Sequence, residues 1–325
     1  MKRIVEKIKA DGWKSFLPAV TYRVNKLAGD VYSKIVLRNP FFTHLLPFAT
    51  PPILLLSFPR SGSSWVGEVL AQSENLAYLF EPVTRPYQKY QSSYAMADLR
   101  NPRIYQKYLE YSTQAFQGMP LREWDSSENS KDFSLLGRKH RRLLIKEVNP
   151  RATELYCQHF HPVVLFLIRH PAAVALSFWN QGWLTSPDVQ MDTTHLDGDE
   201  WFRFGYAYGS AMEQALETLQ RLKVGYNILH YEDLAEDPFT QFKTIYEYLA
   251  VDPPHNYSEV INEYCFSDPT FQGYETRRIS KMMIAKWKKQ LTPAMITNIR
   301  NGYFRSGFDF YQAEIDWTFA AFDEF

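Results

Sequence analysis

A turn rich in serine and glycine is the part of this sequence best suited to bind an anion. It follows an apolar run at 53–56 and leads into a stretch of helical character that begins at Ser63. Gly62 lets the backbone approach a ligand closely, and N–H groups at the start of a helix point toward an anion that the helix dipole also favours. Arg60 adds a permanent positive charge and a planar set of donors for phosphate or sulfate oxygens. The turn therefore predicts an anion-binding loop made of Arg60, Ser61, Gly62, Ser63, Ser64 and Trp65.

From the residues alone, other interpretations of this turn are open. An ordinary strand-to-helix turn with serine caps has a similar composition. A nucleotide triphosphatase or kinase-like phosphotransferase is a further alternative, but it requires Gly-x-x-x-x-Gly-Lys-Ser/Thr, in which a lysine and a Mg²⁺ ligand stand in fixed register. That pattern is absent from the chain.

The elements that must position this loop alternate between short apolar runs and longer segments of helical character. Such alternation is typical of an α/β fold with a central parallel sheet flanked by helices. The predicted strands are 52–58, 77–80, 143–148, 163–168 and 227–231, and the predicted helices are 63–72, 151–159, 172–181, 200–222, 238–249 and 293–305. Residues 85–142 do not fit the alternation, and we interpret them as an insertion that covers a site on the acceptor side.

The charged and aromatic candidates share one position relative to the predicted strands. Each lies at, or just past, the C-terminal end of a strand, where open α/β sheets bind their ligands. They are Arg60, Glu81, Lys146, Arg169 and Tyr231.

Composition limits the possible functions. The 325 residues include 36 Lys plus Arg and 36 Asp plus Glu, so no excess charge recruits nucleic acid. No apolar run approaches the roughly 20 residues needed to span a bilayer, and no secretory signal pattern is present. Only two cysteines occur, Cys157 and Cys265, which favours a reducing compartment and a cytoplasmic location.

Charge patterning divides the chain into three parts. Residues 1–40 hold nine Lys or Arg against three acids, with apolar residues at helical spacing, which predicts a helical arm that packs on the core or touches a membrane surface. The tail carries five acids after Phe308 and no Lys or Arg, and we expect a docked extension or a partner contact. The predicted organisation is an N-terminal helical arm at 1–50, a catalytic domain at 51–308 and an acidic, aromatic tail at 309–325.

The turn Pro-Arg-Ser-Gly-Ser-Ser-Trp resembles the 5′-phosphosulfate loop of sulfotransferases that use 3′-phosphoadenosine 5′-phosphosulfate (PAPS). A second segment, 163–177, is similar to the family's 3′-phosphate motif, because an apolar strand ends in Arg169 and a helix opened by Pro171 carries Ser177. Taken alone, Arg169 could be a surface ion-pair residue and Ser177 a hydroxyl within a helix. The resemblance implies a P-loop NTPase-like sulfotransferase fold, PAPS as sulfuryl donor and no metal.

Two further matches extend the resemblance over roughly 52–308. The segment His230-Tyr-Glu-Asp-Leu is similar to a family stretch in which the tyrosine meets adenine, which gives that role to Tyr231 and packs Trp65 against the base. A place in the hydrophobic core is the alternative for either ring. The segment 277–293 resembles the loop that closes over the nucleotide, although the family's Arg-Lys-Gly form is missing. Its predicted nucleotide ligands are Arg277, Arg278 and Lys281.

The resemblance also identifies a general base. The cytosolic small-molecule branch uses a histidine in a Lys-Thr-His stretch, where this chain has Val148, whereas the carbohydrate branch uses a glutamate after the second strand. The chain is thus closer to the carbohydrate-type branch, with Glu81 as base and Lys146 and Arg60 stabilising the reacting oxygens. Glu147 is the reserve base, but alternation along a strand should turn it away from Lys146. An ion-paired or solvated carboxylate is the alternative for Glu81.

The resemblance implies a small-molecule or glycan acceptor, such as a hydroxyl of a carbohydrate, a glycolipid or another natural product. The basic run 138–142 predicts a solvated face, which could attract an anionic acceptor. A non-catalytic protein of this fold that binds nucleotides or glycans remains an alternative. The oligomeric state stays open.

Overall fold

The computed structural model describes residues 46–91, 96–118, 137–184, 193, 195–266 and 283–318. The N-terminal arm predicted at 1–50 lies outside the described residues except for 46–50, and the predicted ligands Arg277, Arg278 and Lys281 lie outside them entirely. The predicted tail is described as far as residue 318.

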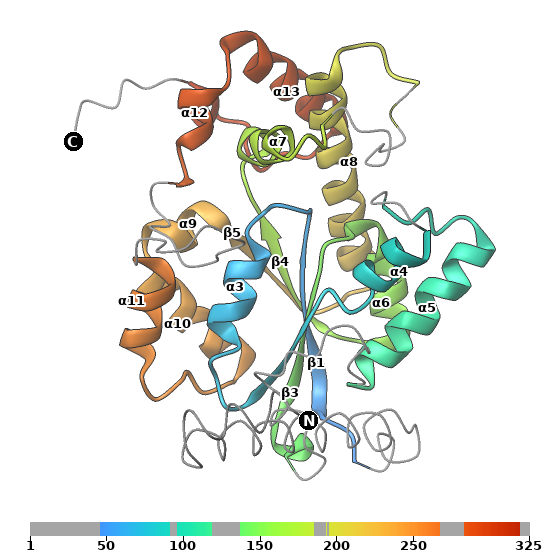
Figure 1. The fold of residues 1–325 in the computed structure, drawn as a ribbon, viewed down its shortest axis with the longest axis vertical. Helices are drawn as coiled ribbons and strands as arrows, with labels where there is room; N and C mark the ends of the chain where they lie inside the picture. Colours follow the sequence, from blue (N-terminus) through green and yellow to red (C-terminus); the bar gives the residue numbers. More distant parts are fainter. Residues whose placement is uncertain are drawn as a thin grey trace, which may run out of the picture.

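Five parallel strands form one central sheet (Figure 1). All five predicted strands are confirmed, because short apolar runs suit the strands of a parallel sheet that helices cover on both faces. The strand order is β2-β3-β1-β4-β5, so the chain runs to one side of β1 and then to the other. The strands are β1 (Ala49–Ser57), β2 (Leu76–Phe80), β3 (Arg142–Glu147), β4 (Val163–Ile168) and β5 (Tyr226–His230).

Helices cover both faces of the sheet, as predicted (Figure 1). Side chains along β1 alternate between two hydrophobic clusters, with Ile53 and Leu55 in one and Leu54 and Leu56 in the other. The first cluster packs under α3 (Ser63–Leu70), α9 (Tyr231–Glu236), α10 (Pro238–Leu249) and α11 (Tyr257–Cys265). The second packs under α5 (Pro102–Phe116), α6 (Thr153–Phe160) and α8 (Glu200–Arg221).

Three helices, α7 (Pro171–Asn180), α12 (Lys286–Gln290) and α13 (Pro293–Ser306), gather beyond the carboxyl ends of the strands (Figure 1). Glycine lets α13 touch α8 backbone to backbone. A Cβ added at Gly205 would lie 2.1 Å from the carbonyl oxygen of Ile299, and one added at Gly302 would lie 1.9 Å from that of Phe202. The two helices therefore form one rigid support for α7.

The segment 85–142 contains two helices that the sequence interpretation did not predict, most of α4 (Thr84–Gln91) and all of α5. Tyr108 and Ala115 of α5 are buried in the core of the domain. This part of the chain is therefore built into the second helical layer.

The basic run 138–142 differs from the predicted solvated face. Arg138 is fully buried in a short 3₁₀ helix, Arg138–His140, and donates hydrogen bonds to the carbonyl oxygens of Gln117 and Gly118. Arg142 begins β3, so the run lies at the amino end of the sheet, opposite the end where ligands bind. The expectation of a solvated face that attracts an acceptor is wrong for Arg138, because its guanidinium satisfies backbone carbonyls instead.

Candidate active site

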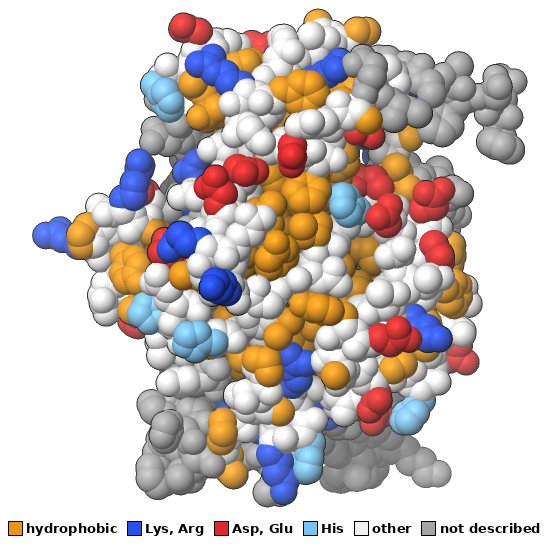
Figure 2. All heavy atoms as spheres, turned by 180° about the vertical axis from the view of Figure 1, so that it is seen from behind, with side chains coloured by type: hydrophobic (Ala, Val, Ile, Leu, Met, Phe, Trp, Pro, Cys, Tyr) orange, Lys and Arg blue, Asp and Glu red, His pale blue; other side chains and the backbone are white. Residues whose placement is uncertain are grey.

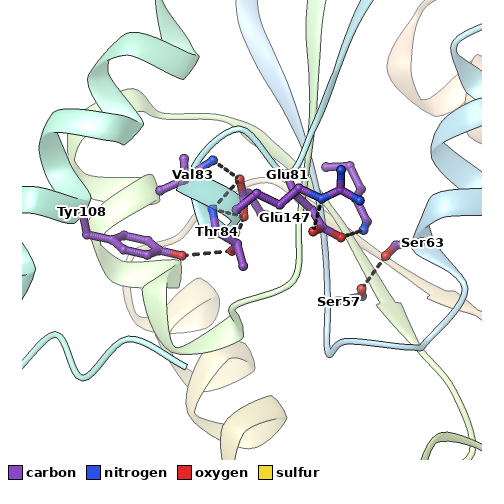
Figure 3. Close-up of polar contacts among 9 residues, drawn as sticks. Ser57, Ser63, Glu81, Val83, Thr84, Tyr108 and Glu147 are labelled. Carbon is purple, nitrogen blue, oxygen red and sulfur yellow. Dashed lines mark hydrogen bonds and ion pairs between the residues drawn. The ribbon is translucent and has the colours of Figure 1, made fainter. Parts of the chain in front are cut away.

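The predicted anion loop connects β1 to α3 at the centre of the sheet. Gly62 has φ 94° at the N-terminus of α3, a conformation that glycine adopts without strain. A Cβ on Gly62 would lie 2.6 Å from ring carbons of Tyr231, so this position also requires the smallest residue. Behind the loop, the Ser57 hydroxyl donates to the Ser63 hydroxyl at 2.8 Å, which ties the end of β1 to the start of α3 (Figure 3).

The loop has unsatisfied hydrogen-bonding groups of the kind that an anion satisfies. Among the described residues, no acceptor bonds the backbone N–H groups of Ser63, Ser64 or Trp65 at the start of α3. The Ser61 hydroxyl is buried and also lacks a partner in that part of the chain. Buried polar groups are nearly always paired in folded proteins, so these donors fit a phosphate or sulfate ligand.

The structure brings the two arginine motifs together at this loop. The Arg60 Nε donates to the Ser177 hydroxyl at 2.9 Å, and the Arg169 guanidinium donates to the Arg60 carbonyl oxygen at 3.2 Å. Arg169 also donates to the carbonyl oxygen of Met283 at 3.3 Å, two residues after Lys281 within the predicted closing segment 277–293. Residues that follow β1 and β4, together with one from α7, thus surround one position, and no ordinary turn requires that convergence.

Tyr231 and Trp65 lie beside this cationic group. The Arg169 guanidinium lies 4.1 Å from the centre of the Tyr231 ring, in a cation–π contact. Trp65 meets Tyr231 edge to face at 5.6 Å and donates its indole N–H to the carbonyl oxygen of Tyr264. Both rings are 2% exposed, so the structure places them in the core next to the loop.

Glu81 forms an ion-paired cluster at the other end of the site. Its carboxylate accepts hydrogen bonds from the Lys146 ammonium and from the Arg85 Nε, the latter at 3.1 Å. Its backbone has φ 48°, and its N–H donates to the Lys146 carbonyl oxygen at 2.8 Å. Burial raises the pKa of Glu81, but the charges and hydrogen bonds of Lys146 and Arg85 outweigh it, so that the pKa is lowered. The carboxylate is therefore ionised at neutral pH.

Glu147 lies on the opposite face of β3, as strand alternation predicts. Its carboxylate accepts hydrogen bonds from the N–H of Val83 at 2.6 Å and from the hydroxyl of Thr84 at 2.5 Å (Figure 3). The Thr84 hydroxyl also contacts Tyr108 of α5 at 3.3 Å. Burial raises the pKa of Glu147 to about 7, although the hydrogen bonds from Thr84 and Val83 oppose the shift. Glu147 therefore caps α4 from inside the core and does not face Lys146.

Sequence reasoning missed several residues that hold the site. Arg85 was not singled out, although it lies four residues after Glu81 and such spacing on a helix permits an ion pair. Tyr208 donates its hydroxyl to the Arg169 carbonyl oxygen at 2.6 Å, and no local pattern indicates a contact between residues so far apart. Glu232 accepts a hydrogen bond from the His170 N–H at 3.0 Å, and its place directly after Tyr231 was the available signal.

The described residues form neither a metal site nor a membrane-spanning helix. None of their His, Cys, Asp and Glu side chains gather in threes in a way that could hold a metal ion. In the same part of the chain, no helix has both the length and the apolar character to cross a membrane.

Comparison with known proteins identifies one family that this chain resembles. Residues 50–306 match the model of the sulfotransferase domain family. A sulfotransferase domain from the curacin biosynthetic pathway has a similar fold, with a TM-score of 0.51 and 17% identity over 81% of this chain and 99% of that one. Mouse sulfotransferase SULT7A1 complexed with PAP also matches, with a TM-score of 0.46 and 13% identity over 86% of this chain and 93% of that one.

Among curated proteins, none matches this chain. The family match covers most of the sequence, including every described residue of the anion loop and of the Glu81 cluster. It confirms the resemblance and the predicted fold class, and the chain belongs to the sulfotransferase family.

Proposed function

We propose that this protein transfers a sulfuryl group from PAPS to a hydroxyl of a carbohydrate, a glycolipid or another natural product. The observation that carries the proposal is the convergence of Arg60, Arg169 and Ser177 on a helix N-terminus with unsatisfied N–H groups. PAPS carries anionic groups at two positions of its ribose, and two arginines from different strands suit two anionic groups.

The residues around the loop divide the donor between them in this proposal. Arg60, the loop N–H groups and the hydroxyls of Ser61, Ser63 and Ser64 bind the 5′-phosphosulfate. Arg169 and Ser177 bind the 3′-phosphate, joined by Arg277, Arg278 and Lys281 from outside the described residues. Tyr231 and Trp65 form the aromatic side of the adenine site. When bound, PAPS would supply the activated sulfuryl group, and adenosine 3′,5′-bisphosphate (PAP) would be the leaving group.

Glu81 is the proposed general base. It would accept the proton of the acceptor hydroxyl at a carboxylate oxygen, while Lys146 and Arg60 stabilise negative charge on the neighbouring oxygens. The ionised state of Glu81 supports this role, since a base must be unprotonated before it acts. Glu147 is disfavoured because Val83 and Thr84 already use its oxygens inside the core.

The acceptor is proposed to bind beside the segment 85–142, because α4 starts three residues after Glu81 and carries Arg85. A cytoplasmic location is also proposed, since the sequence has only two cysteines, Cys157 and Cys265, which suits a reducing compartment. The contact of the N-terminal arm with a membrane surface remains a prediction.

Calorimetric titration with 3′-phosphoadenosine 5′-phosphate (PAP), 5′-AMP and ATP, with and without Mg²⁺, tests the donor. We expect tight, metal-independent binding of PAP, and much weaker binding of AMP because it lacks the 3′-phosphate. A preference for ATP with Mg²⁺ would favour a phosphotransferase. Binding of none of the three would contradict the proposed donor.

Transfer from radiolabelled PAPS to a panel of sugars, glycolipids and phenols separates an enzyme from a binding protein. Labelled product that requires Glu81 supports the proposed reaction. Tight PAP binding without transfer to any acceptor, and without any effect of Glu81→Gln, would favour a non-catalytic nucleotide-binding protein.

A further inference from the structure

The C-terminal segment after α13 docks against the part of the chain that holds Arg169. Tyr311 and Trp317 are buried, with 7% and 4% of their surface exposed, although they lie beyond the family match that ends at residue 306. The Tyr303 hydroxyl accepts the N–H of Tyr311 at 3.2 Å, which fixes the segment to α13. The Trp317 indole N–H donates to the Tyr311 carbonyl oxygen at 2.8 Å and closes the segment through the short helix α14 (Glu314–Trp317).

An aromatic cluster receives this segment. The ring of His170 stacks on Trp287 of α12, with 4.4 Å between centroids and an angle of 9°. Trp317 and Tyr311 meet the same imidazole edge to face at 4.5 and 5.0 Å. Burial lowers the pKa of His170 to about 3, so the ring is neutral and packs as an aromatic group.

A single carboxylate connects the cluster to the proposed 3′-phosphate site. The Glu232 carboxylate accepts a hydrogen bond from the backbone N–H of His170 at 3.0 Å on one oxygen and from the Tyr311 hydroxyl at 2.8 Å on the other. His170 follows Arg169 and Glu232 follows Tyr231, and Arg169 and Tyr231 form the cation–π contact described above. Each partner of that contact is therefore next to a residue that the C-terminal segment holds.

We propose that residues 308–318 act as a clamp that positions Arg169 against Tyr231 and so determines the preference for a nucleotide with a 3′-phosphate. This inference rests on the proposed donor. Tyr311, Trp317 and Glu232 are positioning residues here, because they act through Arg169 and do not themselves touch the ligand.

The test compares Tyr311→Phe with wild type by calorimetry, using PAP directly and 5′-AMP by displacement of PAP. Tyr311→Phe removes the hydroxyl that donates to Glu232 and keeps the buried ring. We expect the ratio of the AMP and PAP dissociation constants to fall about fivefold, since a hydrogen bond to a charged group is lost one step away from the ligand. The matched control is Tyr257→Phe on α11, outside this cluster. It removes a hydroxyl that donates to the Phe239 carbonyl oxygen at 2.6 Å.

If folded Tyr311→Phe weakens PAP and AMP equally, or weakens neither, the ratio of their dissociation constants is unchanged. That result would overturn the inference and leave the proposed donor intact. If wild type itself does not bind PAP, the proposed donor fails and the inference fails with it. Trp317→Phe, which keeps a ring but removes the N–H bonded to Tyr311, gives a second, independent measurement of the ratio.

Discussion

Charged side chains at the two ends of the sheet's carboxyl-terminal edge, where the candidate site lies, have different kinds of hydrogen-bond partner. At the β4–β5 end, the Arg169 guanidinium donates to the carbonyl oxygens of Arg60 and Met283, and no carboxylate in the described part of the chain pairs with it. At the β2–β3 end, Glu81 is paired with both Lys146 and Arg85. Neutral acceptors leave the charge of Arg169 available to an anionic ligand, whereas the Glu81 carboxylate offsets part of the charge of Lys146 and Arg85 at the other end.

This difference separates binding from chemistry. The β4–β5 end is organised to attract an anion, while the β2–β3 end holds one carboxylate ionised next to two cations. The lowered pKa of Glu81 makes it a weak base as long as Lys146 contacts it. Any ligand oxygen that draws Lys146 away would raise the pKa of Glu81 and strengthen it as a base.

The largest expected effect is on the β2–β3 end. Glu81→Gln should lower kcat for sulfuryl transfer about 1,000-fold, since general base catalysis contributes that order of rate, and should leave the Kd of PAP within about twofold. Glu110→Gln is the control, because it changes the same type of side chain in an exposed ion pair with Lys107 on α5. Full turnover by folded Glu81→Gln would mean that another group takes the proton.

The next effect concerns the β4–β5 end. Arg169→Ala should weaken PAP binding about 30-fold in calorimetry and AMP binding much less, because a charge-assisted hydrogen bond to the 3′-phosphate is lost. Arg100→Ala is the matched control, since Arg100 pairs with Asp98 on the surface. Equal weakening of both nucleotides would place the 3′-phosphate elsewhere.

A pair of glycines sharpens the account of the loop. Gly62 and Gly182 both have positive φ, 94° and 68°, but a Cβ would strike Tyr231 only at Gly62, and nothing lies within 4 Å at Gly182. Both alanine variants should lose about 1 kcal/mol of stability from backbone strain. Only Gly62→Ala should also weaken PAP, by about tenfold, because it displaces Tyr231 from the loop; the same loss in Gly182→Ala would exclude that cause.

The smallest effect is a pH dependence of stability. The pKa of Glu147 is raised from 4.5 to about 7 in the folded chain, so the folded state binds this proton more tightly than the unfolded state does. Its stabilising contribution is complete below about pH 4.5 and is lost as the pH rises toward about 7. Glu147→Gln mimics the protonated form, so its Tm relative to wild type should rise by a few degrees between pH 5 and pH 8. A constant Tm difference would mean that Glu147 is ionised throughout.

The sequence was sufficient to predict the strands and the residues at their ends. Short apolar runs separated by longer helical segments leave few alternatives to a parallel sheet, and a parallel sheet places its strand ends along one edge. The loop of Gly62 and the motif of Arg169 were therefore assigned to the same edge before any distance was known.

The missed features depend on contacts between distant segments. The helix α5 was overlooked because its buried face carries Tyr108 and Ser112, which do not form an apolar pattern. The pairing of Glu81 with Lys146 depends on the register of β2 against β3, which brings Phe80 opposite Lys146. The docking of Tyr311 and Trp317 depends on ring contacts with His170, and no local pattern encodes contacts between residues so far apart in the sequence.

The central position of β1 has a consequence for how the protein is made. As the first described strand to leave the ribosome, β1 emerges with both hydrogen-bonding edges unpaired, and its neighbours β3 and β4 follow much later. Leu56 pairs with Glu147 on one side and with Phe166 on the other, so these contacts are long-range and slow to form. The loop around Gly62 is thus synthesised early, yet it gains its scaffold only after residues up to Ile168 have been translated.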